Sequence, residues 1–574
     1  PYRRSMGCGA LRIGDEMSLR VICGIEPGLD FRAPHRVLRP RSIGEALAAL
    51  QTCEEAHRSG FWIAGYLSYE FGASLQGATI ADSSTPLLAL GIFDAPARAS
   101  ACIPEADVRI SALLPAVTQA SYDASIASIL RSIYDGDVYQ VNFTIPYEFS
   151  MDGDAKRLWE TVARTTGARY QAYVEDEDRR ILSWSPELFL SFEGSRVATG
   201  PMKGTAPVGD ADALQSAKNR AEHVMIVDLL RNDLRRIATG VTVEALAALE
   251  AYPTFLTLTS TVAGTLEKSP AFEEIVRAMF PCGSVTGAPK RSAIERIALL
   301  ETSPRAAYCG TIGYLSPAHR GWWNVAIRTA QVRGSRGVFH AGGGIVCDST
   351  AGGEWNEIAT KATFLRLRAE PLELLESFAS NAAPGTIEAH LVRLASSAEA
   401  FDIAYDPLAL ARAVNEACRA AHKIVRLRLR ADGTFSIGTE QLEIPHEPVA
   451  ICVSRECVTR DDPFLRHKTA WRPAHERASA YARVHGCFDA LVQNEDAQLT
   501  EGSRTNLFIE IDGALWTPPL KSGALPGILR SRIVSKGRAH ERILTLRDLI
   551  SAREVFVGNS ARGLLRARLV NTRA

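Results

Sequence analysis

Residues 199–233 have the sequence TGPMKGTAPVGDADALQSAKNRAEHVMIVDLLRND. The first part is a turn rich in Gly and Pro that carries a single lysine, Lys203. Apolar residues recur at helical spacing in the second part, at Ile226, Leu229, Leu230 and Leu234. This period predicts a helix with one face towards the core. Glu222 lies four residues before Ile226 and therefore projects from the same face.

A carboxylate on a core-facing helix stripe is costly unless a cation or several hydrogen bonds compensate it. Three interpretations of Glu222 follow: a metal ligand, a catalytic acid, or a structural ion pair with a nearby arginine. Residue type alone favours the ion pair, because buried carboxylates are usually paired. The other motifs of the chain change this preference for the ion pair.

Length and composition limit the classes of protein that this chain can represent. The 574 residues exceed one hydrophobic core and predict two to four structural units. Lys plus Arg and Asp plus Glu both total 65, so no net field attracts nucleic acid or an anionic membrane. No apolar run reaches the roughly 18 residues of a membrane span. We therefore expect no nucleic-acid partner and no membrane partner.

Cysteine usage and the start of the chain bear on its location. The eleven cysteines are scattered without a CxxC pair, which is typical of reduced thiols in a cytoplasm. Residues 1–17, PYRRSMGCGALRIGDEM, have no apolar h-region and predict a flexible tail or an altered terminus. We expect a cytoplasmic protein.

A candidate acid interrupts a predicted strand. Residues 181–194, ILSWSPELFLSFEG, predict a strand broken at Ser185-Pro186-Glu187. Among aromatic residues Glu187 would have a raised pKa and could hold a proton at neutral pH. An exposed loop glutamate is the alternative, and residue type alone favours it.

A candidate anion site follows in residues 280–301, FPCGSVTGAPKRSAIERIALLE. They predict a loop that leads into a helix, with Thr286 as its cap and Pro289 in its first turn. Free N–H groups at a helix start, together with Lys290 and Arg291, favour an anion. A well-capped helix without a ligand is the alternative.

A glycine-rich segment precedes two further carboxylates. Gly342, Gly343 and Gly344 remove side chains where the backbone must approach another group closely. The helix predicted after Gly353 places three charged residues on one face: Glu354, Glu357 and Lys361. With Glu222, its two carboxylates can hold a divalent cation such as Mg²⁺; a solvated charged face is the alternative. Arg328, in the predicted strand 323–334, needs a carboxylate partner.

Several long motifs occur in the order of one enzyme family. They are SPE (185–187), PMKGT (201–205), AEHVMIVDLLRND (221–233), GSVTGAPK (283–290), GTIGYL (310–315), AIRTA (326–330) and HAGGGIVCDS (340–349). The chain thereby resembles the chorismate-utilising enzymes, which include anthranilate, isochorismate and aminodeoxychorismate synthases. The resemblance implies an α/β (α+β) fold with a two-sheet core over residues 1–370 and Mg²⁺ at Glu222 and Glu357, with Glu354 nearby. It also implies chorismate contacts by Thr286, Tyr314, Arg328, Gly343, Gly344 and Lys361.

Lys203 distinguishes subgroups of this family. Aminodeoxychorismate synthases carry Lys in the PxKGT turn, whereas anthranilate synthases usually have a small residue. The family mechanism has this amine add at C2 of chorismate while Glu187 protonates the departing C4 hydroxyl. Purely ionic pairing of Lys203 with a substrate carboxylate is the alternative. Thr257 replaces the His of the HLxS motif, which is compatible with stopping at the amino-deoxy product.

A second pattern begins after a predicted boundary at about 368–372. Residues 423–437 predict a hairpin around Asp432-Gly433. FLRHKTAWRP (464–473) sets Lys468 beside Arg466 and His467, and positive neighbours lower the pKa of a lysine. A low pKa suits a lysine that bonds to a cofactor, while a solvated loop lysine is the alternative.

Residues 371–574 resemble the fold-type IV pyridoxal-phosphate (PLP) family and its aminodeoxychorismate lyases. The resemblance implies that Lys468 holds the cofactor and that Glu501 keeps its pyridine nitrogen protonated. Phosphate contacts are implied for Arg393 of the HxxRL pattern, for backbone at Gly527 and Ile528, and for Ser560. Family members have a longer lead with a YGDG-type turn, so this site is either supplied differently or degenerate.

Together the two resemblances imply one pathway segment. The product of the first activity, 4-amino-4-deoxychorismate, is the substrate of the second, which yields 4-aminobenzoate for folate synthesis. No GxCxGxQ-type glutaminase turn is present, so ammonia is expected from solution or from a separate glutamine amidotransferase subunit. Fold-type IV enzymes are generally dimers, so a homodimer is expected. The alternatives are an anthranilate synthase-like enzyme, a synthase fused to an aminotransferase-like or inactive PLP domain, and a non-catalytic chorismate-binding protein.

Overall fold

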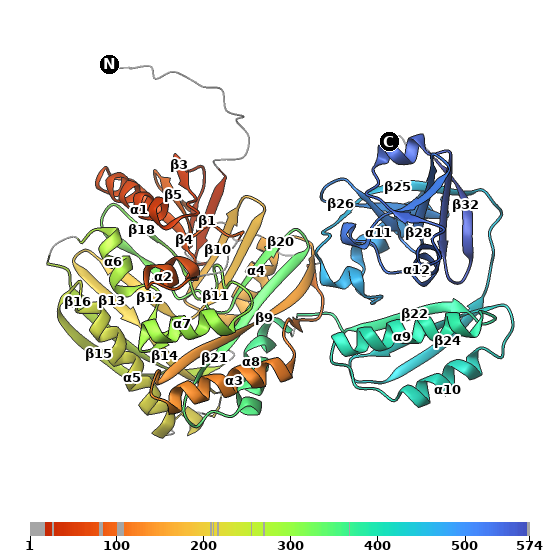
Figure 1. The fold of residues 1–574 in the computed structure, drawn as a ribbon. Helices are drawn as coiled ribbons and strands as arrows, with labels where there is room; N and C mark the ends of the chain where they lie inside the picture. Colours follow the sequence, from red (N-terminus) through yellow and green to blue (C-terminus); the bar gives the residue numbers. More distant parts are fainter. Residues whose placement is uncertain are drawn as a thin grey trace, which may run out of the picture.

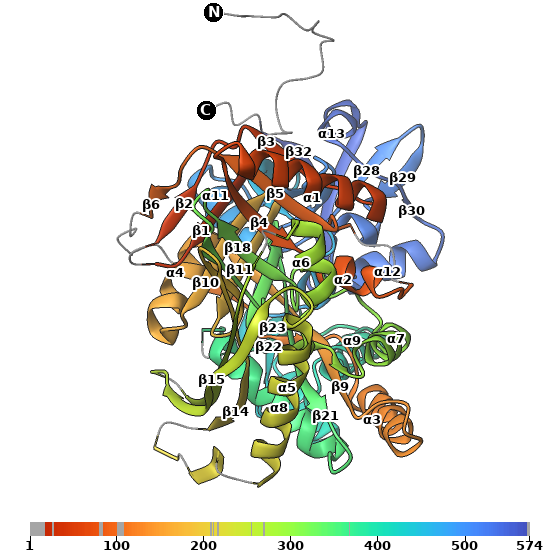
Figure 2. The ribbon, with the colours of Figure 1, turned by 90° about the vertical axis from the view of Figure 1, so that its left-hand side faces the viewer.

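The chain forms two lobes, which lie side by side in Figure 1 and one behind the other in Figure 2. The computed structural model describes residues 18–25, 28–79, 84–99, 108–206, 209–210, 212–214, 217–253, 255–267, 270–366 and 368–570. The tail predicted at residues 1–17 lies outside the described residues. None of the described helices is long and apolar enough to cross a membrane.

Two antiparallel sheets build the first lobe. One runs in the order β17 (Gly287–Ala288), β9 (Gln140–Asp152), β21 (Arg336–Ile345), β20 (Thr329–Arg333), β11 (Arg179–Ser185), β10 (Tyr170–Asp176), β1 (Leu19–Cys23), β2 (Leu29–Phe31) and β6 (Ala97–Arg98), and β7 (Arg109–Ile110) and β8 (Leu114–Pro115) pair with β9. The other runs in the order β14 (Met202–Ala206), β16 (Leu256–Thr265), β13 (Arg196–Gly200), β12 (Leu188–Glu193), β19 (Arg320–Asn324), β18 (Thr311–Leu315), β4 (Trp62–Leu67), β5 (Leu88–Phe93) and β3 (Arg36–Leu38), with β15 (Thr239–Ala251) on β16.

An apolar layer joins strands of both sheets, and helices pack against the sheets from outside. The layer contains buried side chains such as Val21, Phe31, Tyr66, Ile181 and Ile312. The helices are α1 (Ile43–Arg58), α2 (Tyr69–Leu75), α3 (Gln119–Tyr134), α4 (Ala155–Thr166), α5 (Ala217–Leu234), α6 (Phe272–Met279), α7 (Lys290–Leu300) and α8 (Ala351–Arg366). Burial of both faces of each sheet explains the long apolar runs of these strands.

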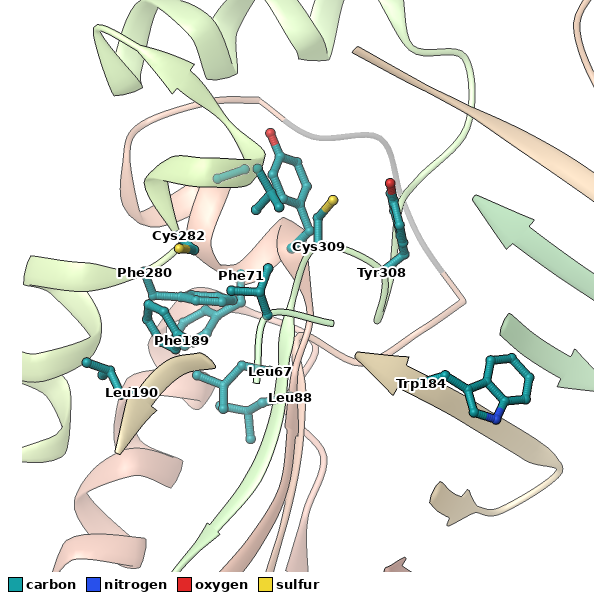
Figure 3. Packing of buried hydrophobic residues seen from close by; sticks show 14 of the residues in the cluster. Leu67, Phe71, Leu88, Trp184, Phe189, Leu190, Phe280, Cys282, Tyr308 and Cys309 are labelled. Atoms are coloured by element: carbon teal, nitrogen blue, oxygen red, sulfur yellow. The ribbon is translucent and has the colours of Figure 1, made fainter. Parts of the chain in front are cut away.

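The larger core positions two segments that carry candidate site residues. Figure 3 shows the rings of Phe71, Phe189 and Phe280 gathered beside Leu67. The Phe189 and Phe280 ring centroids are 5.9 Å apart in an edge-to-face contact, and Phe71 lies 6.4 Å from Phe280. Such aromatic contacts fix side-chain orientation as well as burying area. They therefore fix the position of β12 relative to the turn before α7.

Several predicted elements are confirmed. The helix with the apolar stripe is α5, in which Ile226, Leu230 and Leu234 are fully buried. The interrupted strand is the pair β11 and β12, separated by Pro186 and Glu187. The Asp-Gly hairpin is formed by β23 (Lys423–Arg430) and β24 (Phe435–Gln441).

The predicted start of the helix at 290–300 is wrong in its cap. Helix α7 begins at Lys290, and its N-cap is Pro289, which has no side-chain cap. Thr286 instead ends the turn η2 (Gly283–Val285), where its hydroxyl donates to the carbonyls of Cys282 and Gly283. Because the backbone at Pro289 is extended, the helix begins only at Lys290. The Thr286 hydroxyl bonds to carbonyls of its own turn and therefore does not cap the helix.

The second lobe contains a small and a large sheet. The small sheet is β22 (Glu373–Ala379), β23 and β24, with α9 (Pro384–Ala400) and α10 (Pro407–Ala417) against it. The large mixed sheet runs β27 (Leu499–Gly502), β26 (Asp489–Asn494), β25 (Val449–Val458), β32 (Gly563–Leu569), β31 (Glu554–Asn559), β28 (Asn506–Ile511), β29 (Ala514–Thr517) and β30 (His540–Glu541). Three helices complete the lobe: α11 (Pro473–Val484), α12 (Ile528–Ser535) and α13 (Leu546–Ser551).

The connection between the lobes is short. Helix α8 ends at Arg366 and strand β22 begins at Glu373. The boundary expected at 368–372 falls between these two elements and remains a prediction about independent folding units.

Candidate active sites

Lys203 lies where strands of the two sheets approach each other. It belongs to β14, the edge strand of the second sheet, and its Nζ is 3.2 Å from Glu222 Oε2 on α5. A Cβ atom on Gly344 of β21 would lie 3.1 Å from this Nζ and 2.5 Å from Gln140 Nε2. Gly344 therefore allows the lysine and the glutamine amide to approach the backbone of β21. The ion-pair partner of Glu222 is thus a lysine, not the arginine expected from residue type.

Glu187 is a buried acid, only 3% exposed, so the exposed-loop alternative is wrong. Its Oε1 accepts a hydrogen bond of 2.6 Å from the Ser284 hydroxyl. Burial raises the pKa of Glu187 to about 7, although the Ser284 hydrogen bond and the Lys203 charge act in the opposite direction. At neutral pH the carboxyl group is therefore protonated in a large fraction of molecules, and it can donate a proton.

The two carboxylates of α8 face the glycine segment. A Cβ atom on Gly343 would lie 3.0 Å from Glu354 Oε2 and 3.9 Å from Glu357 Oε1. Glu354 is buried and accepts a 2.6 Å hydrogen bond from Ser349, whereas Glu357 is exposed and lies 2.8 Å from Lys361. Lys361 also donates to the Gly342 carbonyl at 2.9 Å. The face formed by Glu354, Glu357 and Lys361 therefore packs on β21, and only Glu357 is largely solvated.

The donor chemistry of these carboxylates fits Mg²⁺, although they do not form a closed cage. Across the described ranges, no three His, Cys, Asp or Glu side chains lie close enough to hold a metal by themselves. Glu222 is bonded to Lys203, while Glu354 and Glu357 face Gly343. Mg²⁺ prefers carboxylate oxygens and completes its shell with water and substrate oxygens. Binding of Mg²⁺ at Glu222, Glu354 and Glu357 remains a prediction.

Among the described residues, Arg328 is a cation without a carboxylate partner. It has φ +50° just before β20, and its guanidinium carbon lies 3.9 Å from the centre of the Phe255 ring. In the part of the chain that the structure describes, no carboxylate pairs with it, and burial lowers its pKa to about 10. A desolvated guanidinium in this state favours an anionic ligand. The predicted need of Arg328 for a carboxylate is therefore not met by the described residues, and substrate binding by Arg328 stays a prediction.

The structure does not bring Tyr314 to this cluster. Its ring packs on Phe31, Trp62 and Trp322, with centroid distances of 5.6, 6.1 and 5.7 Å. Alternation along β18 points Ile312 and Tyr314 into the apolar layer between the sheets. Thr286 is fully buried, and its hydroxyl is used by carbonyls of its own turn.

Other residues support the Lys203 cluster. The hydroxyl of Thr257 donates to the Gly204 carbonyl at 2.7 Å and so steadies the turn that carries Lys203. Gln140 is fully buried, and among the described residues neither polar atom of its amide has a partner. The sequence did not predict Ser284 as a site residue, although it lies in the GSVTG motif. Its partner Glu187 is 97 positions away in the chain.

The second cluster surrounds Lys468 in the other lobe. Lys468 is partly buried and follows the short helix η3 (Pro463–Arg466). Burial lowers its pKa to about 8, and the charge of Glu376 opposes this shift. The predicted cause was wrong: Arg466 is exposed, and the cations that contribute are the more distant Arg472 and Arg393.

Glu501 is held as an anion beside this lysine. It accepts hydrogen bonds from Arg472 and from Asn506, the latter at 3.1 Å, and His475 Nε2 lies 3.1 Å from its Oε1. Burial alone would raise the pKa of Glu501, but Arg472 and His475 lower it to about 2. An ionised buried carboxylate is the group that a protonated pyridine nitrogen requires. Sequence reasoning found Glu501 but none of its three partners.

Arg393 is engaged differently from the expectation. Its guanidinium donates two hydrogen bonds to the buried Glu376, at 2.8 and 2.6 Å, and one to the Pro526 carbonyl at 2.9 Å. Glu376 also contacts His390, whose other ring nitrogen lies 2.7 Å from the Ser560 hydroxyl. Arg393 thus contacts the segment predicted to bind phosphate. The two N–H groups that would bind the phosphate, however, donate to the Glu376 carboxylate. Sequence reasoning missed Glu376, in the segment 372–377 (LELLES), as the residue that joins these groups.

A cavity beside Ser560 fits an anion. It measures about 290 Å³ and is lined by residues that include Thr386, Ile528, Arg532 and Ser560. Gly527 is the N-cap of α12, and it provides no side-chain cap for the helix start. A helix N-terminus together with an arginine and a hydroxyl favours phosphate. The chain therefore has groups that fit PLP: an amine of lowered pKa, an ionised carboxylate and a phosphate-sized anion site.

Comparison with known proteins places both lobes in families. The sequence pattern of the chorismate binding enzymes matches residues 93–366, and that of the class IV amino-transferases matches residues 375–570. The chain joins a chorismate-binding enzyme domain to a class IV aminotransferase domain. The expected fold class, a two-sheet domain followed by a fold-type IV domain, is confirmed.

Individual relatives align with the first domain. Aminodeoxychorismate synthase component 1 of Salmonella typhimurium is 38% identical over 256 residues, covering 43% of this chain and 56% of the relative. Anthranilate synthase component 1 of Saccharolobus solfataricus is 33% identical over 257 residues, covering 43% of this chain and 61% of the relative. The chain thus spans somewhat more than half the length of these curated relatives. The crystal structure of anthranilate synthase component I from Streptococcus pneumoniae shares the fold, with a TM-score of 0.52 and 24% identity over 63% of this chain and 95% of that one.

Proposed function

We propose that the chain converts chorismate and ammonia to 4-aminobenzoate in two steps, one in each domain. The first domain forms 4-amino-4-deoxychorismate, and the second eliminates pyruvate from it. The observation that carries the proposal is a lysine amine in each domain, each beside buried carboxylates suited to that chemistry. The 38% identity to a protein named aminodeoxychorismate synthase component 1 supports the first step.

In the first step Lys203 acts as a nucleophile. Its neutral amine adds at C2 of chorismate, and Glu187 donates a proton so that the C4 hydroxyl leaves as water. Ammonia then adds at C4, and the bond between C2 and Lys203 breaks. Arg328, which pairs with no carboxylate among the described residues, and Lys361, which donates to the Gly342 carbonyl, bind the carboxylates of the substrate. Mg²⁺, held by Glu222, Glu354 and Glu357, would neutralise the ring carboxylate.

In the second step Lys468 moves a proton. PLP, when bound, supplies the electron sink for bond changes next to the amino group. Glu501 would hold the ring nitrogen of PLP, and the start of α12 with Ser560 and Arg532 would hold its phosphate. The Lys468 amine, with a pKa of about 8, accepts the C4 proton and returns it to the enolpyruvyl methylene as pyruvate leaves. The products are 4-aminobenzoate and pyruvate, and no atom is left over.

The proposal includes partners. Ammonia comes from a separate glutamine amidotransferase subunit, and the designation of the relatives as component 1 supports such a division. All described cysteines are free thiols, which supports a cytoplasmic location. We also expect a homodimer, as fold-type IV enzymes generally form.

Product identification tests the proposal. The purified chain, saturated with PLP, is incubated with chorismate, Mg²⁺ and an ammonium salt, and the products are separated and identified by mass. 4-Aminobenzoate and pyruvate in equal amounts are expected. Anthranilate would mean that the first domain aminates chorismate at C2 instead of C4. Accumulated 4-amino-4-deoxychorismate would mean that the second domain is not a lyase.

A further inference from the structure

The lysine loop, residues 459–472, joins β25 to α11 and carries Lys468. It lies where the second lobe meets the first, and contacts from the first domain reach both of its ends. Side chains of β9, β7 and the turn between β20 and β21 make these contacts. None of them belongs to the chemistry of the first domain.

At the first end of the loop, Asp462 is buried, only 5% exposed. Its Oδ1 accepts from the Phe464 N–H at 3.0 Å and so caps the short helix that leads to Lys468. Its Oδ2 accepts from two hydroxyls of the first domain, Ser150 at 2.6 Å and Ser335 at 3.1 Å. A buried carboxylate is stable only with such donors, so the position of the cap depends on the first domain.

The turn beside Ser335 adds a second contact. The Ser335 N–H donates to the Thr459 hydroxyl at 2.9 Å. Gly334, with φ +58°, lies so close that a Cβ there would be 2.3 Å from this hydroxyl. The turn between β20 and β21 therefore fits against the start of the loop without room for a side chain.

The other end of the loop is covered as well. The Arg109 guanidinium carbon lies 5.2 Å from the centre of the Trp471 ring, and Arg109 also pairs with Glu476 at 3.2 Å. The next residue of α11, Arg477, pairs with Asp152 at 2.7 Å. Trp471 directly precedes Arg472, which holds Glu501. The first domain thus also contacts the segment that orients the acidic partner of the cofactor site.

Within the second domain, main-chain bonds from β22 hold the middle of the loop, and side-chain contacts hold Arg460 to Glu495 and Asp496 and His467 to Ser397. The Leu375 N–H donates to the Lys468 carbonyl at 2.7 Å, and the Ala470 N–H donates to the Glu373 carbonyl at 2.8 Å. We propose that the chorismate-binding domain is a structural part of the second active site, where Ser150 and Ser335 act through Asp462 as positioning residues for Lys468. This inference rests on the proposed function only in taking Lys468 as the cofactor lysine. An interface that merely tethers the lobes would leave the loop unchanged when these bonds are removed.

The test uses the full chain with Ser150→Ala and measures the loop directly. Hydrogen exchange of peptides covering residues 459–472 is expected to accelerate at least about tenfold, the size of effect expected when a buried hydrogen bond to a charged group is lost. PLP affinity, followed by the near-visible absorbance of the bound cofactor, is expected to weaken by a similar factor. Formation of 4-amino-4-deoxychorismate should not change. The conservative variant Ser150→Thr, which keeps the hydroxyl, should restore both values.

Ser132→Ala is the matched control, because Ser132 is a buried serine of α3 whose hydroxyl, among the described residues, bonds only to the Ser128 carbonyl. Ser335→Ala, which removes the longer bond, serves as the milder variant if Ser150→Ala folds poorly. Unchanged loop exchange and unchanged PLP affinity in both variants would overturn the inference. If the unaltered chain binds PLP but makes no 4-aminobenzoate, the proposed function fails, while loop exchange and PLP affinity still decide the positioning role.

Discussion

Glu187 and Glu501 are buried glutamates whose surroundings give them opposite charge states. Burial with a single hydroxyl donor raises the pKa of Glu187 to about 7, whereas Arg472 and His475 bring that of Glu501 to about 2. The aromatic neighbours of Glu187 in the sequence suggested a raised pKa, although residue type alone favoured an exposed loop glutamate. The partners of Glu501 were not predictable, because they lie 26 and 29 positions away on another element.

Replacement of Glu187 by Gln tests the role of the acid. The variant keeps an acceptor for Ser284 but has no proton to donate, so amination should slow by at least about 100-fold. In the unaltered enzyme, amination should fall as the pH rises through about 7, because Glu187 then loses its proton. Initial rates of 4-amino-4-deoxychorismate formation between pH 5.5 and 9 measure both effects.

Ser284→Ala is the companion to that measurement. The Ser284 hydrogen bond lowers the pKa of Glu187, so its removal should move the falling limb of the rate profile to higher pH. A limb that stays in place in Ser284→Ala, or persists in Glu187→Gln, would assign the titration to another group.

Glu501→Gln tests the ion cluster through stability. A folded pKa below the unfolded value means that Glu501 stabilises the fold above pH ~4.5, and that this contribution is lost as the pH falls towards 2. At pH 7 the variant leaves the largely buried Arg472 without its anion and should lose about 3 kcal/mol of unfolding free energy. The difference from the unaltered chain should shrink below pH ~4.

Urea unfolding at pH 7 and pH 3 measures this difference. Glu510→Gln, at a partly exposed ion pair with Arg553 in the same domain, is the control and should change stability by less than about 1 kcal/mol. A Glu501→Gln deficit that is equally large at pH 3 would show that charge is not its cause.

At the level of elements, periodicity predicted more than side-chain contacts did. The apolar stripe predicted α5, and the Asp-Gly pair predicted the hairpin of β23 and β24. The prediction that Thr286 caps the helix was wrong, because the backbone at Pro289 is extended and α7 begins only at Lys290. Tyr314 was assigned to the site by its motif, but alternation along β18 turns it into the apolar layer. A motif shows only that its residues are close in sequence. The alternation of side chains along a strand decides which face of the sheet each residue occupies.

Gly527→Ala tests the start of α12 as an anion site. A Cβ at Gly527 would lie 1.9 Å from Asn506 Oδ1, and Asn506 also donates to Glu501. The variant must displace Asn506, so PLP affinity should fall at least about tenfold, the effect of a moderate overpacking strain. Gly385→Ala is the control, because a Cβ there meets no atom within 4 Å. Equal PLP titration curves for both variants would remove α12 from the cofactor site.

At the scale of the whole molecule, motifs in family order predicted two domains and both lysines. They did not predict how the domains touch. Ser150 and Asp462 are separated by 312 positions, and neither belongs to a recognisable motif. Such a contact depends on the shape of both folded surfaces, which sequence patterns do not encode locally. The same reasoning explains why Glu376, which joins Arg393 to His390, was overlooked.

The division of labour between the domains is tested most directly by complementation of two full-length variants. Lys203→Ala with chorismate, Mg²⁺ and ammonium should form no amino-deoxy product above about 1% of the unaltered rate. Lys468→Ala should accumulate 4-amino-4-deoxychorismate without pyruvate. Mixed in equal amounts, the two variants should form 4-aminobenzoate, because the first product of one is the substrate of the other. 4-Aminobenzoate from either variant alone at the unaltered rate would contradict the assignment of one lysine to each step.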